Sequence, residues 1–193
     1  MVEALKHFFK QFSFLGVKEI ASLVQLCEFK QIKQGTILVN AGDYNYNTFV
    51  VLKGLLRNYI IKHNGEERTT LFASEGMMTS SPNTFFKDLP SNEGVMALED
   101  CWIAYFDMRK FEKLARENLK LQRLFTEALK LNFVEAITRL EYHTTMSPEE
   151  RYEHFRYHHP NLLQRVPQIY LASYLGITPV SLSRVRARLA KKK

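Results

Sequence analysis

The order of apolar and polar residues divides the chain into a middle part with strand-like alternation and two flanking parts with helical spacing. In the middle part, short runs rich in β-branched and aromatic residues alternate with turn residues such as Gly35, Gly54 and Pro90. Many short strands at close spacing are typical of an antiparallel sandwich or barrel. We therefore expect strands at residues 29–32, 36–39, 48–52, 55–61, 68–72, 94–98 and 102–106.

Asn64 and Gly65 lie between two of these runs. Both residue types tolerate the positive φ angles of a type I′ turn, which joins the strands of a two-residue β-hairpin. The pair therefore predicts a tight hairpin between the strands at 55–61 and 68–72.

Helical periodicity occupies residues 2–12 and 17–27 before the strands, and residues 108–115 and 119–143 after them. The last of these helices carries two neighbouring apolar stripes. One stripe would pack on the parent domain, and a twin helix from a second subunit is the economical partner for the other. A monomer whose terminal domain covers that second stripe is the alternative. The stripes are Leu121, Leu124, Ala128 and Leu131, and Phe125, Leu129, Phe133, Ala136 and Leu140.

The stripe that faces the second subunit is left open, and the residues assigned to the dimer helix are Leu121, Leu124, Phe125, Ala128 and Leu131. Ser147-Pro148-Glu149-Glu150 then forms a capping box with proline at the first helical position, and it predicts a new helix that ends near His158. We therefore expect a strand-rich domain at residues 1–117, a long helix at 118–145 and a terminal domain at 146–193.

The terminal part contains PQIYLASYLGITPVSLSRVRARL, which reads as two short helices with a bend at Gly176. Apolar Ile169, Leu171, Ala172 and Leu175 belong to the first helix, and Val180, Leu182, Val185 and Leu189 to the second, which is a helix-turn-helix pattern. Pro167 suits a first helical turn, Gly176 can take a positive φ, Thr178 can cap the second helix, and Pro179 can follow as its first residue. The residues left to face outward are Ser181, Ser183, Arg184, Arg186 and Arg188.

Positive charge gathers in the same part of the chain. The formal net charge is +7, and the residues beyond Glu153 include eight lysines and arginines and no acidic residue. The first 153 residues therefore carry about −1. A basic excess confined to one small domain is typical of a surface that binds the phosphates of nucleic acid.

Other features of the sequence exclude several classes of protein. No apolar run is long enough to span a membrane, and the first residues lack a signal-peptide pattern, so we expect a cytoplasmic protein. Cys27 and Cys101 are too few for an iron–sulfur or zinc site and are interpreted as core residues.

His154 and His158 are spaced to chelate a metal, but two exposed histidines are the preferred interpretation. His7 and His63 remain open as haem ligands, and we expect no cofactor.

The predicted β-roll, long helix, capped helix and terminal helix-turn-helix together resemble the Crp/Fnr superfamily of bacterial transcription regulators, particularly its short members from Bacteroidetes. The segment LASYLGITPVSLSRVRARL is the most specific part of this resemblance. It implies an α+β fold with an antiparallel, cyclic-nucleotide-binding-like β-roll, a dimerisation helix and a winged-helix-like DNA-binding domain. It also implies a homodimer that places its second helix in the major groove of a two-fold operator on double-stranded DNA and contacts RNA polymerase.

Carried over by position, the resemblance assigns base contacts to Pro179, Val180, Ser181 and Arg184. The phosphate contacts would come from Thr178, Ser183, Arg186, Arg188, Lys191 and Lys192. Arg184 agrees with simple chemistry, because a guanidinium can donate two hydrogen bonds to guanine O6 and N7.

The effector site of the resemblance is degenerate in this sequence. Family members that bind cyclic nucleotides hold the sugar and phosphate with Gly-Glu and, further along, Arg-Ser or Arg-Thr. Here Ser80-Ser81 and Ser91-Asn92-Glu93 stand at those places, so a cyclic phosphate would meet a carboxylate instead of a cation. We expect no cyclic AMP binding, and the effector is unknown. The degenerate pocket would comprise Met77, Met78, Ser80, Ser81, Ser91 and Asn92. Met77, Met78, Phe85 and Phe86 could line an apolar pocket, but we prefer to interpret them as core residues.

The sequence thus favours a sequence-specific, homodimeric transcription regulator. A small-ligand sensor whose basic tail binds nucleic acid loosely, or docks on a protein, is the alternative. An enzyme is disfavoured, because the glycines are spaced as turn residues and no nucleophile elbow is present.

Overall fold

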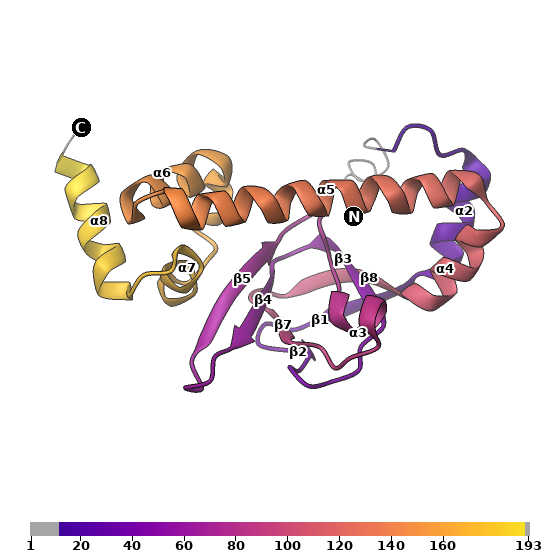
Figure 1. The fold of residues 1–193 in the computed structure, drawn as a ribbon, viewed down its shortest axis with the longest axis horizontal. Coiled ribbons are helices and arrows are strands. Elements are labelled where there is room, and N and C mark those ends of the chain that lie inside the picture. Colours follow the sequence, from indigo (N-terminus) through magenta and orange to yellow (C-terminus); the bar gives the residue numbers. More distant parts are fainter. Residues whose placement is uncertain (1–11, 192–193) are drawn as a thin grey trace.

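The computed structural model describes residues 12–191 of the 193-residue chain. The helix expected at residues 2–12 and the candidate haem ligand His7 therefore lie outside the described residues, apart from Phe12. Figure 1 shows the arrangement: two sheets form a β-roll, one long helix runs along it, and the C-terminal helices gather beyond one end of the roll.

Eight strands form the β-roll, and every strand pairing is antiparallel. One sheet has the order β1-β8-β3-β6 and the other the order β2-β7-β4-β5. All seven expected strands are confirmed. The bounds are β1 Glu28–Ile32, β2 Ile37–Val39, β3 Asn47–Lys53, β4 Leu56–Ile61, β5 Glu67–Ala73, β6 Met78–Thr79, β7 Glu93–Ala97 and β8 Cys101–Asp107.

Two elements between β5 and β7 were missed by the sequence analysis. They are the short strand β6 and the helix α3 (Pro82–Lys87). Ser81-Pro82 is the signal that could have located α3, because it places a capping residue before a proline at the first helical position. The helix ends at Asp88, which takes a left-handed φ of 52°.

The turn between β4 and β5 differs from the expected one. Gly65 has a φ of 82°, but Asn64 is absent from the described non-glycine residues with positive φ, so the type I′ prediction was wrong. Hydrogen bonds from Gly65 N to the Lys62 carbonyl oxygen (2.9 Å) and from Lys62 N to the Glu66 carbonyl oxygen (2.8 Å) close a longer loop. A wider loop with one left-handed glycine is the next most common hairpin connection.

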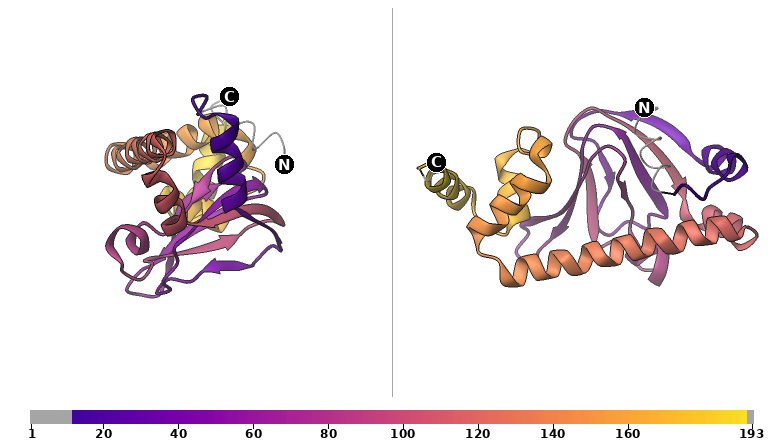
Figure 2. Two further views of the ribbon diagram at one scale, coloured as in Figure 1. Left: turned by 90° about the vertical axis from the view of Figure 1, so that its right-hand side faces the viewer. Right: turned by 90° about the horizontal axis from the view of Figure 1, so that it is seen from above.

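Helices cover the roll and extend from it. The helix α5 (Leu119–Thr145) runs along the side of the roll, from α4 (Met108–Arg116) at one end to α6 (Pro148–His158) at the other (Figures 1 and 2). Asn118 caps the start of α5, its side chain accepting hydrogen bonds from Lys120 N and Leu121 N. The remaining described helices are α2 (Val17–Leu26), α7 (Gln168–Leu175), α8 (Pro179–Lys191) and the 3₁₀ turn η1 (Pro160–Leu162). No helix of the described part of the chain is both long and apolar enough to cross a membrane.

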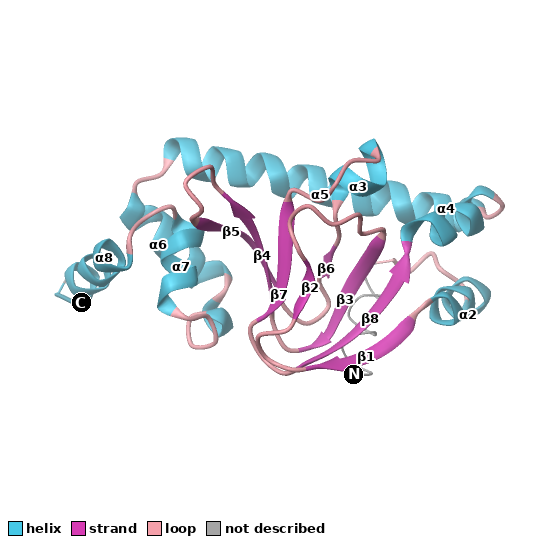
Figure 3. Ribbon diagram, turned by 90° about the horizontal axis from the view of Figure 1, so that it is seen from below, coloured by secondary structure: helices cyan, strands magenta, loops and turns pink. Residues whose placement is uncertain are grey.

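The C-terminal helices share a core with the β-roll. Leu55, Phe72 and Leu98 of the roll belong to the same buried cluster as Phe155 of α6 and residues of α7 and α8. The ring centroid of Phe72 lies 6.2 Å from that of Phe155 and 5.2 Å from that of Tyr174. Figure 3 shows α7 beside β5, which explains how apolar residues of both parts meet.

Acidification is expected to destabilise this part of the fold. Burial lowers the pKa of His159, whose ring centroid lies 5.2 Å from that of Phe155. The charge of Glu135 opposes this lowering of the pKa, and the charges of His158 and His154 add to it. Below about pH 6.5 the histidine is protonated in the unfolded chain but remains neutral in the folded chain. The free energy of unfolding should therefore fall as the pH drops below about 6.5. Thermal unfolding of His159→Gln should show a weaker pH dependence than the wild type, whereas His63→Gln, at an exposed loop, should keep it. An unchanged pH dependence in His159→Gln would contradict this assignment.

Candidate nucleic-acid interface

The bend between α7 and α8 is built as the sequence analysis expected. Gly176 takes a φ of 70°, and Pro167 lies one residue before the start of α7. Ile177 N donates to the Ala172 carbonyl oxygen (3.0 Å) and Gly176 N to that of Ser173 (3.1 Å), the paired hydrogen bonds of a Schellman motif. A Cβ at position 176 would also approach the Arg68 guanidinium to 3.0 Å, so glycine suits this bend for two reasons.

The second helix begins where its cap predicts. Thr178 precedes α8, and its hydroxyl oxygen accepts a hydrogen bond from Ser181 N at 3.1 Å. Pro179 is the first residue of α8, where its missing N–H costs nothing. This cap fixes the direction in which α8 leaves the bend.

The inner faces of the two helices pack as predicted, with two exceptions. Ile169 and Val180 are each 61% exposed and do not belong to the core. For Val180 this agrees with the base contact assigned to it, whereas the placement of Ile169 on the apolar inner face was wrong. The buried residues of α7 and α8 are Leu171, Ala172, Leu175, Leu182 and Val185.

The predicted base-reading residues share one accessible surface at the start of α8. Pro179, Val180 and Arg184 are exposed, and Ser181 is partly exposed. Arg184 makes no hydrogen bond or ion pair with any described residue, so its guanidinium is free to meet a ligand. We call Pro179, Val180, Ser181 and Arg184 the α8 reading face.

The predicted phosphate-binding residues fall into two groups. Thr178, Ser183 and Lys191 are exposed, and Lys192 lies outside the described residues. Arg188 is exposed, but its Nε lies 2.7 Å from Glu149 Oε1 at the start of α6.

Arg186 was assigned to the outward face, and the structure corrects this. Its guanidinium carbon lies 5.5 Å from the ring centroid of Tyr152, and its Nε is buried without a hydrogen-bond partner among the described residues. Position 186 is one residue beyond the buried Val185, so the Arg186 side chain turns along the α6 side of α8. We therefore do not place Arg186 among the free phosphate contacts.

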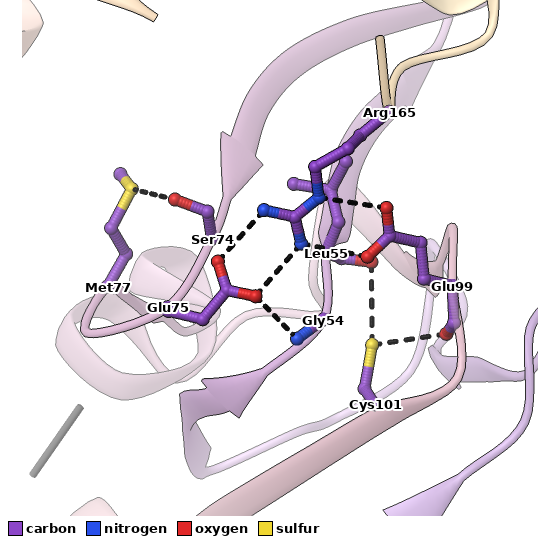
Figure 4. Close-up of polar contacts among 8 residues, drawn as sticks. All are labelled: Gly54, Leu55, Ser74, Glu75, Met77, Glu99, Cys101 and Arg165. Carbon is purple, nitrogen blue, oxygen red and sulfur yellow. Dashed lines mark hydrogen bonds and ion pairs between the residues drawn. The ribbon is translucent and has the colours of Figure 1, made fainter. Parts of the chain in front are cut away.

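An arginine before α7 fixes the terminal helices to the β-roll. Arg165 donates to both carboxylate oxygens of Glu99, at 2.9 and 2.8 Å, and to both of Glu75, at 2.9 Å each (Figure 4). Glu75 also accepts from Gly54 N at 2.9 Å. Although burial alone would raise the pKa of Glu75, Arg165 holds it below its usual range. Bidentate arginine–carboxylate pairs define an orientation as well as a distance.

Further polar contacts join α7 to the roll. The Ser173 hydroxyl accepts from Thr69 N of β5 at 2.9 Å. The buried guanidinium of Arg57 bonds to Thr69 Oγ1 and lies 4.0 Å from the ring centroid of Tyr170. The orientation of the α8 reading face is thus set by the β-roll as well as by its own helices.

The structure decides between the two stripes of α5. Leu121 and Leu124 are buried inside the single chain, so their assignment to a dimer contact was wrong. Phe125 is partly buried in the same cluster, Ala128 lines a cavity, and Leu131 is exposed. Leu129, Phe133, Ala136 and Leu140 are all exposed, and we call them the α5 outer stripe. Leu129 and Ala136 lie at its edge, because they also line the cavity between the roll and α5. The terminal domain does not cover it, which removes the monomer alternative for this stripe.

A cavity of about 460 Å³ lies between the β-roll and α5. Of the predicted pocket residues, Met78, Ser80 and Asn92 line it, together with Phe85 and Phe86. Met77 packs against the core between the sheets. Ser81 and Ser91 are buried outside the lining, and Ser91 Oγ donates to the Glu93 carbonyl oxygen. The sequence therefore located one wall of the cavity, and the walls from α2, β8 and α5 were missed because they are distant along the chain.

The cysteines and histidines form no metal site among residues 12–191. Cys101 is buried beside Leu55 and Glu99 (Figure 4). Cys27 is half-buried, and burial raises its pKa to about 11. The ring centroids of His154 and His158 are 4.2 Å apart with the planes tilted by 38°. Of these two expected exposed histidines, His158 is exposed and His154 is partly buried. Both cysteines are free thiols; Cys101 belongs to the core, as expected, whereas Cys27 lines the cavity.

The chain matches one family model and several solved structures. Residues 29–118 match the family model of the cyclic nucleotide-binding domain. The chain is similar to FixK2 from Bradyrhizobium japonicum, with a TM-score of 0.76, 14% identity and coverage of 86% of this chain and 85% of that one. A search of curated proteins finds no match to the sequence.

Two further solved structures are similar over most of the chain. A putative transcriptional regulator of the Crp/Fnr family from Eubacterium rectale gives a TM-score of 0.74 at 16% identity, covering 96% of this chain and 88% of that one. The catabolite activator protein of Thermus thermophilus gives a TM-score of 0.57 at 20% identity, covering 92% and 85%. At these identities the likeness establishes the fold, and the predicted β-roll, long helix and terminal helices are confirmed. The described part of the terminal domain contains no strand, and so no wing.

Proposed function

We propose that this chain, which carries a cyclic nucleotide-binding domain and has the fold of the Crp/Fnr transcription regulators, is a homodimeric, sequence-specific DNA-binding regulator. The observation that carries the proposal is the α8 reading face: a capped helix presents exposed Val180 and an unpaired Arg184 beside a bend of helix-turn-helix type. In such motifs the second helix enters the major groove and reads bases with its N-terminal residues. We place the protein in the cytoplasm, with RNA polymerase as a further partner.

Selection of bound fragments from random double-stranded DNA tests this function. We expect a two-fold symmetric sequence whose half-sites lie about 34 Å apart, near 10 base pairs or a multiple of that spacing. A single unrepeated half-site would argue against the dimer, and recovery of no preferred sequence would argue against a regulator.

Arg184→Ala should relax base preference and cost about 1–3 kcal/mol of binding free energy at the selected site. Its effect on random DNA should be small, because the lost contact is to base edges. Fluorescence anisotropy with both DNAs measures the two affinities at one salt concentration.

Lys191→Ala is the control, since Lys191 is an exposed cation of the same helix whose expected contact is a phosphate. It should weaken cognate and random DNA alike. Equal losses on both DNAs for Arg184→Ala would remove Arg184 from the reading face.

We further propose that cyclic AMP is not the effector. Among the described residues, Arg139 is the only arginine or lysine lining the cavity; its Nη1 donates to the Thr70 carbonyl oxygen at 2.6 Å, and Glu93 adds a carboxylate to the same lining. An anionic phosphate buried there would meet this carboxylate as well as the guanidinium, so the lining offers it no net positive charge. Isothermal calorimetry should detect no binding of cyclic AMP at micromolar concentrations, and a micromolar dissociation constant would refute the proposal.

The cavity also supports the second candidate function, a small-ligand sensor whose basic tail binds nucleic acid without sequence preference. Salt distinguishes the two candidates. A regulator should keep a large gap between cognate and random affinity as salt rises, whereas a sensor with a charged tail should lose both affinities together.

A further inference from the structure

Arg68 brings a positive charge from the β-roll to the bend between α7 and α8. It lies near the start of β5 and is partly exposed. A Cβ at Gly176 would approach its Nη2 to 3.0 Å, so the guanidinium lies against the backbone of the bend. Gly176 is exposed, and Thr178, two residues further along, is exposed and caps α8. A cation of the β-roll therefore lies beside the start of the helix that carries the α8 reading face.

The guanidinium of Arg68 has no counter-charge within the described part of the chain. It makes no hydrogen bond and no ion pair with any residue between positions 12 and 191. The two acidic residues that precede it are paired elsewhere: Glu67 with Arg57 at 2.6 Å, and Glu66 with Lys62 at 2.9 Å. A partly desolvated guanidinium without an acceptor is unfavourable, so this position suits an anion from outside the chain.

The end of α7 does not require Arg68 as a cap. The last carbonyl oxygen of α7, that of Leu175, accepts a hydrogen bond from Arg151 Nε at 2.9 Å. The two carbonyl oxygens that a Schellman motif pairs are also engaged, as described above. Arg151 thus already supplies the cation that the C-terminus of a helix favours. Capping of α7 therefore does not explain why Arg68 lies at the bend.

The surroundings of the bend are positively charged. Nδ1 of His143, at the end of α5, would lie 4.0 Å from the same Cβ at Gly176. Burial lowers the pKa of His143, and the charges of Arg68, Arg151 and Arg139 lower it further. Arg151 and Arg139 donate to backbone carbonyl oxygens, which leaves their charges unneutralised. Guanidiniums from β5, α5 and α6 thus create a positive potential at one place, which attracts anions.

We propose that Arg68 binds a backbone phosphate of the DNA that the α8 reading face contacts, so that the β-roll forms part of the DNA interface. A phosphate offers the negative charge and the acceptor oxygens that a guanidinium pairs with best. Because phosphate contacts fix register and orientation, Arg68 would also fix the β-roll on the duplex. The proposal rests on the proposed function, since it takes DNA at α8 as its premise.

The salt dependence of DNA binding tests the contact. Arg68→Gln in the full-length chain should weaken binding to the selected operator and to random DNA alike, by about three- to tenfold at 0.15 M salt. The slope of the logarithm of the binding constant against the logarithm of the salt concentration should become shallower by about 0.9 for each phosphate no longer neutralised. Arg68→Lys keeps the charge and should keep the wild-type slope. An unchanged slope in Arg68→Gln would overturn the proposal even if the affinity fell, because a residue that only positions the helices neutralises no phosphate.

Lys110→Gln is the control for loss of one charge. Lys110 is exposed on α4, which lies at the opposite end of α5 from the terminal helices (Figure 1). This variant should keep the affinity and the slope of the wild type. An equal change of slope in Lys110→Gln and Arg68→Gln would show an effect of net charge alone and would also overturn the proposal.

Ethylation interference locates the phosphate. Ethylation of one phosphate in each half-site should weaken binding of the wild type and leave binding of Arg68→Gln unaffected, while the other sensitive phosphates stay the same in both proteins. Identical patterns would contradict the contact. If inorganic pyrophosphate raised the melting temperature of the wild type but not that of Arg68→Gln, and the two DNA slopes were equal, the bend would bind a free anion and the DNA contact would be wrong.

Failure of this proposal is distinguishable from failure of the proposed function. A wild-type chain that selects an operator, with an Arg68→Gln variant of unchanged slope, would refute the Arg68 contact and leave the regulator standing. A chain that selects no sequence would refute the regulator, whereas a shallower slope of Arg68→Gln on random DNA would still support the phosphate contact.

Discussion

Phe133→Asp is expected to convert the protein into a folded monomer and to lower its affinity for a two-fold operator by at least about 100-fold. Phe133 is 67% exposed in the single chain and lies at the centre of the α5 outer stripe. The intervals of four, three and four residues along that stripe are those of a coiled-coil seam, in which a carboxylate would be buried unpaired. Loss of the second subunit removes one half-site contact, and with it the gain from binding both half-sites at once.

Sedimentation velocity measures the association state, and anisotropy with full-site and half-site DNA measures the affinities. Thr138→Asp is the matched control, because Thr138 is exposed on α5 about 200° round the helix from Leu140. The control should remain dimeric. A dimeric Phe133→Asp variant with wild-type affinity for the full site would place the subunit interface elsewhere.

Phe155→Ala is expected to destabilise the β-roll together with the terminal helices, by about 3–5 kcal/mol of unfolding free energy. Phe155 is 2% exposed, and its ring contacts Phe72 of β5 and Tyr174 of α7. Because these residues share one core, removing the ring leaves a cavity that both parts border. The only tryptophan, Trp102 of β8, reports the unfolding of the roll, and far-ultraviolet circular dichroism reports the helices.

Both signals should shift to lower denaturant by the same amount. Tyr157→Ala removes an aromatic ring from the same helix at a position 82% exposed, and it should change stability by less than about 0.5 kcal/mol. A shift of the helix signal in Phe155→Ala without a shift of Trp102 fluorescence would show that the two parts unfold independently.

The sequence predicted those features of the fold that depend on neighbouring residues. Strand alternation located seven strands, and the signals around Ser147, Gly176 and Thr178 located helix ends, because each depends on contacts within a few positions. The turn at Asn64-Gly65 was predicted to be shorter than it is, since the dipeptide alone does not specify the loop length. The strand β6 is only two residues long and too short to give a periodic signal.

Long-range contacts could not be predicted in the same way. Arg165 meets Glu99 and Glu75, which are 66 and 90 positions away, and no local pattern indicates such a pair. The two stripes of α5 are equally apolar in sequence, and only the packing of the roll shows that Leu121 and Leu124 face inward. Arg184 and Arg186 are both arginines of α8, but only the guanidinium of Arg186 lies over the ring of Tyr152 on α6, and the sequence does not indicate this difference.

The ion pairs of the C-terminal arginines bear on how DNA binding responds to electrolytes. Arg156, Arg165 and Arg188 are already neutralised by carboxylates of this chain, namely Glu153, Glu75 with Glu99, and Glu149. An arginine that stays paired with a carboxylate of its own chain displaces no condensed cation from a DNA phosphate. Each phosphate that is newly neutralised contributes about 0.9 to the slope of the logarithm of the binding constant against the logarithm of the salt concentration. The entropy of counterion release should therefore reflect Lys191 and few other described residues, and the slope should be shallower than the formal charge of the terminal segment implies.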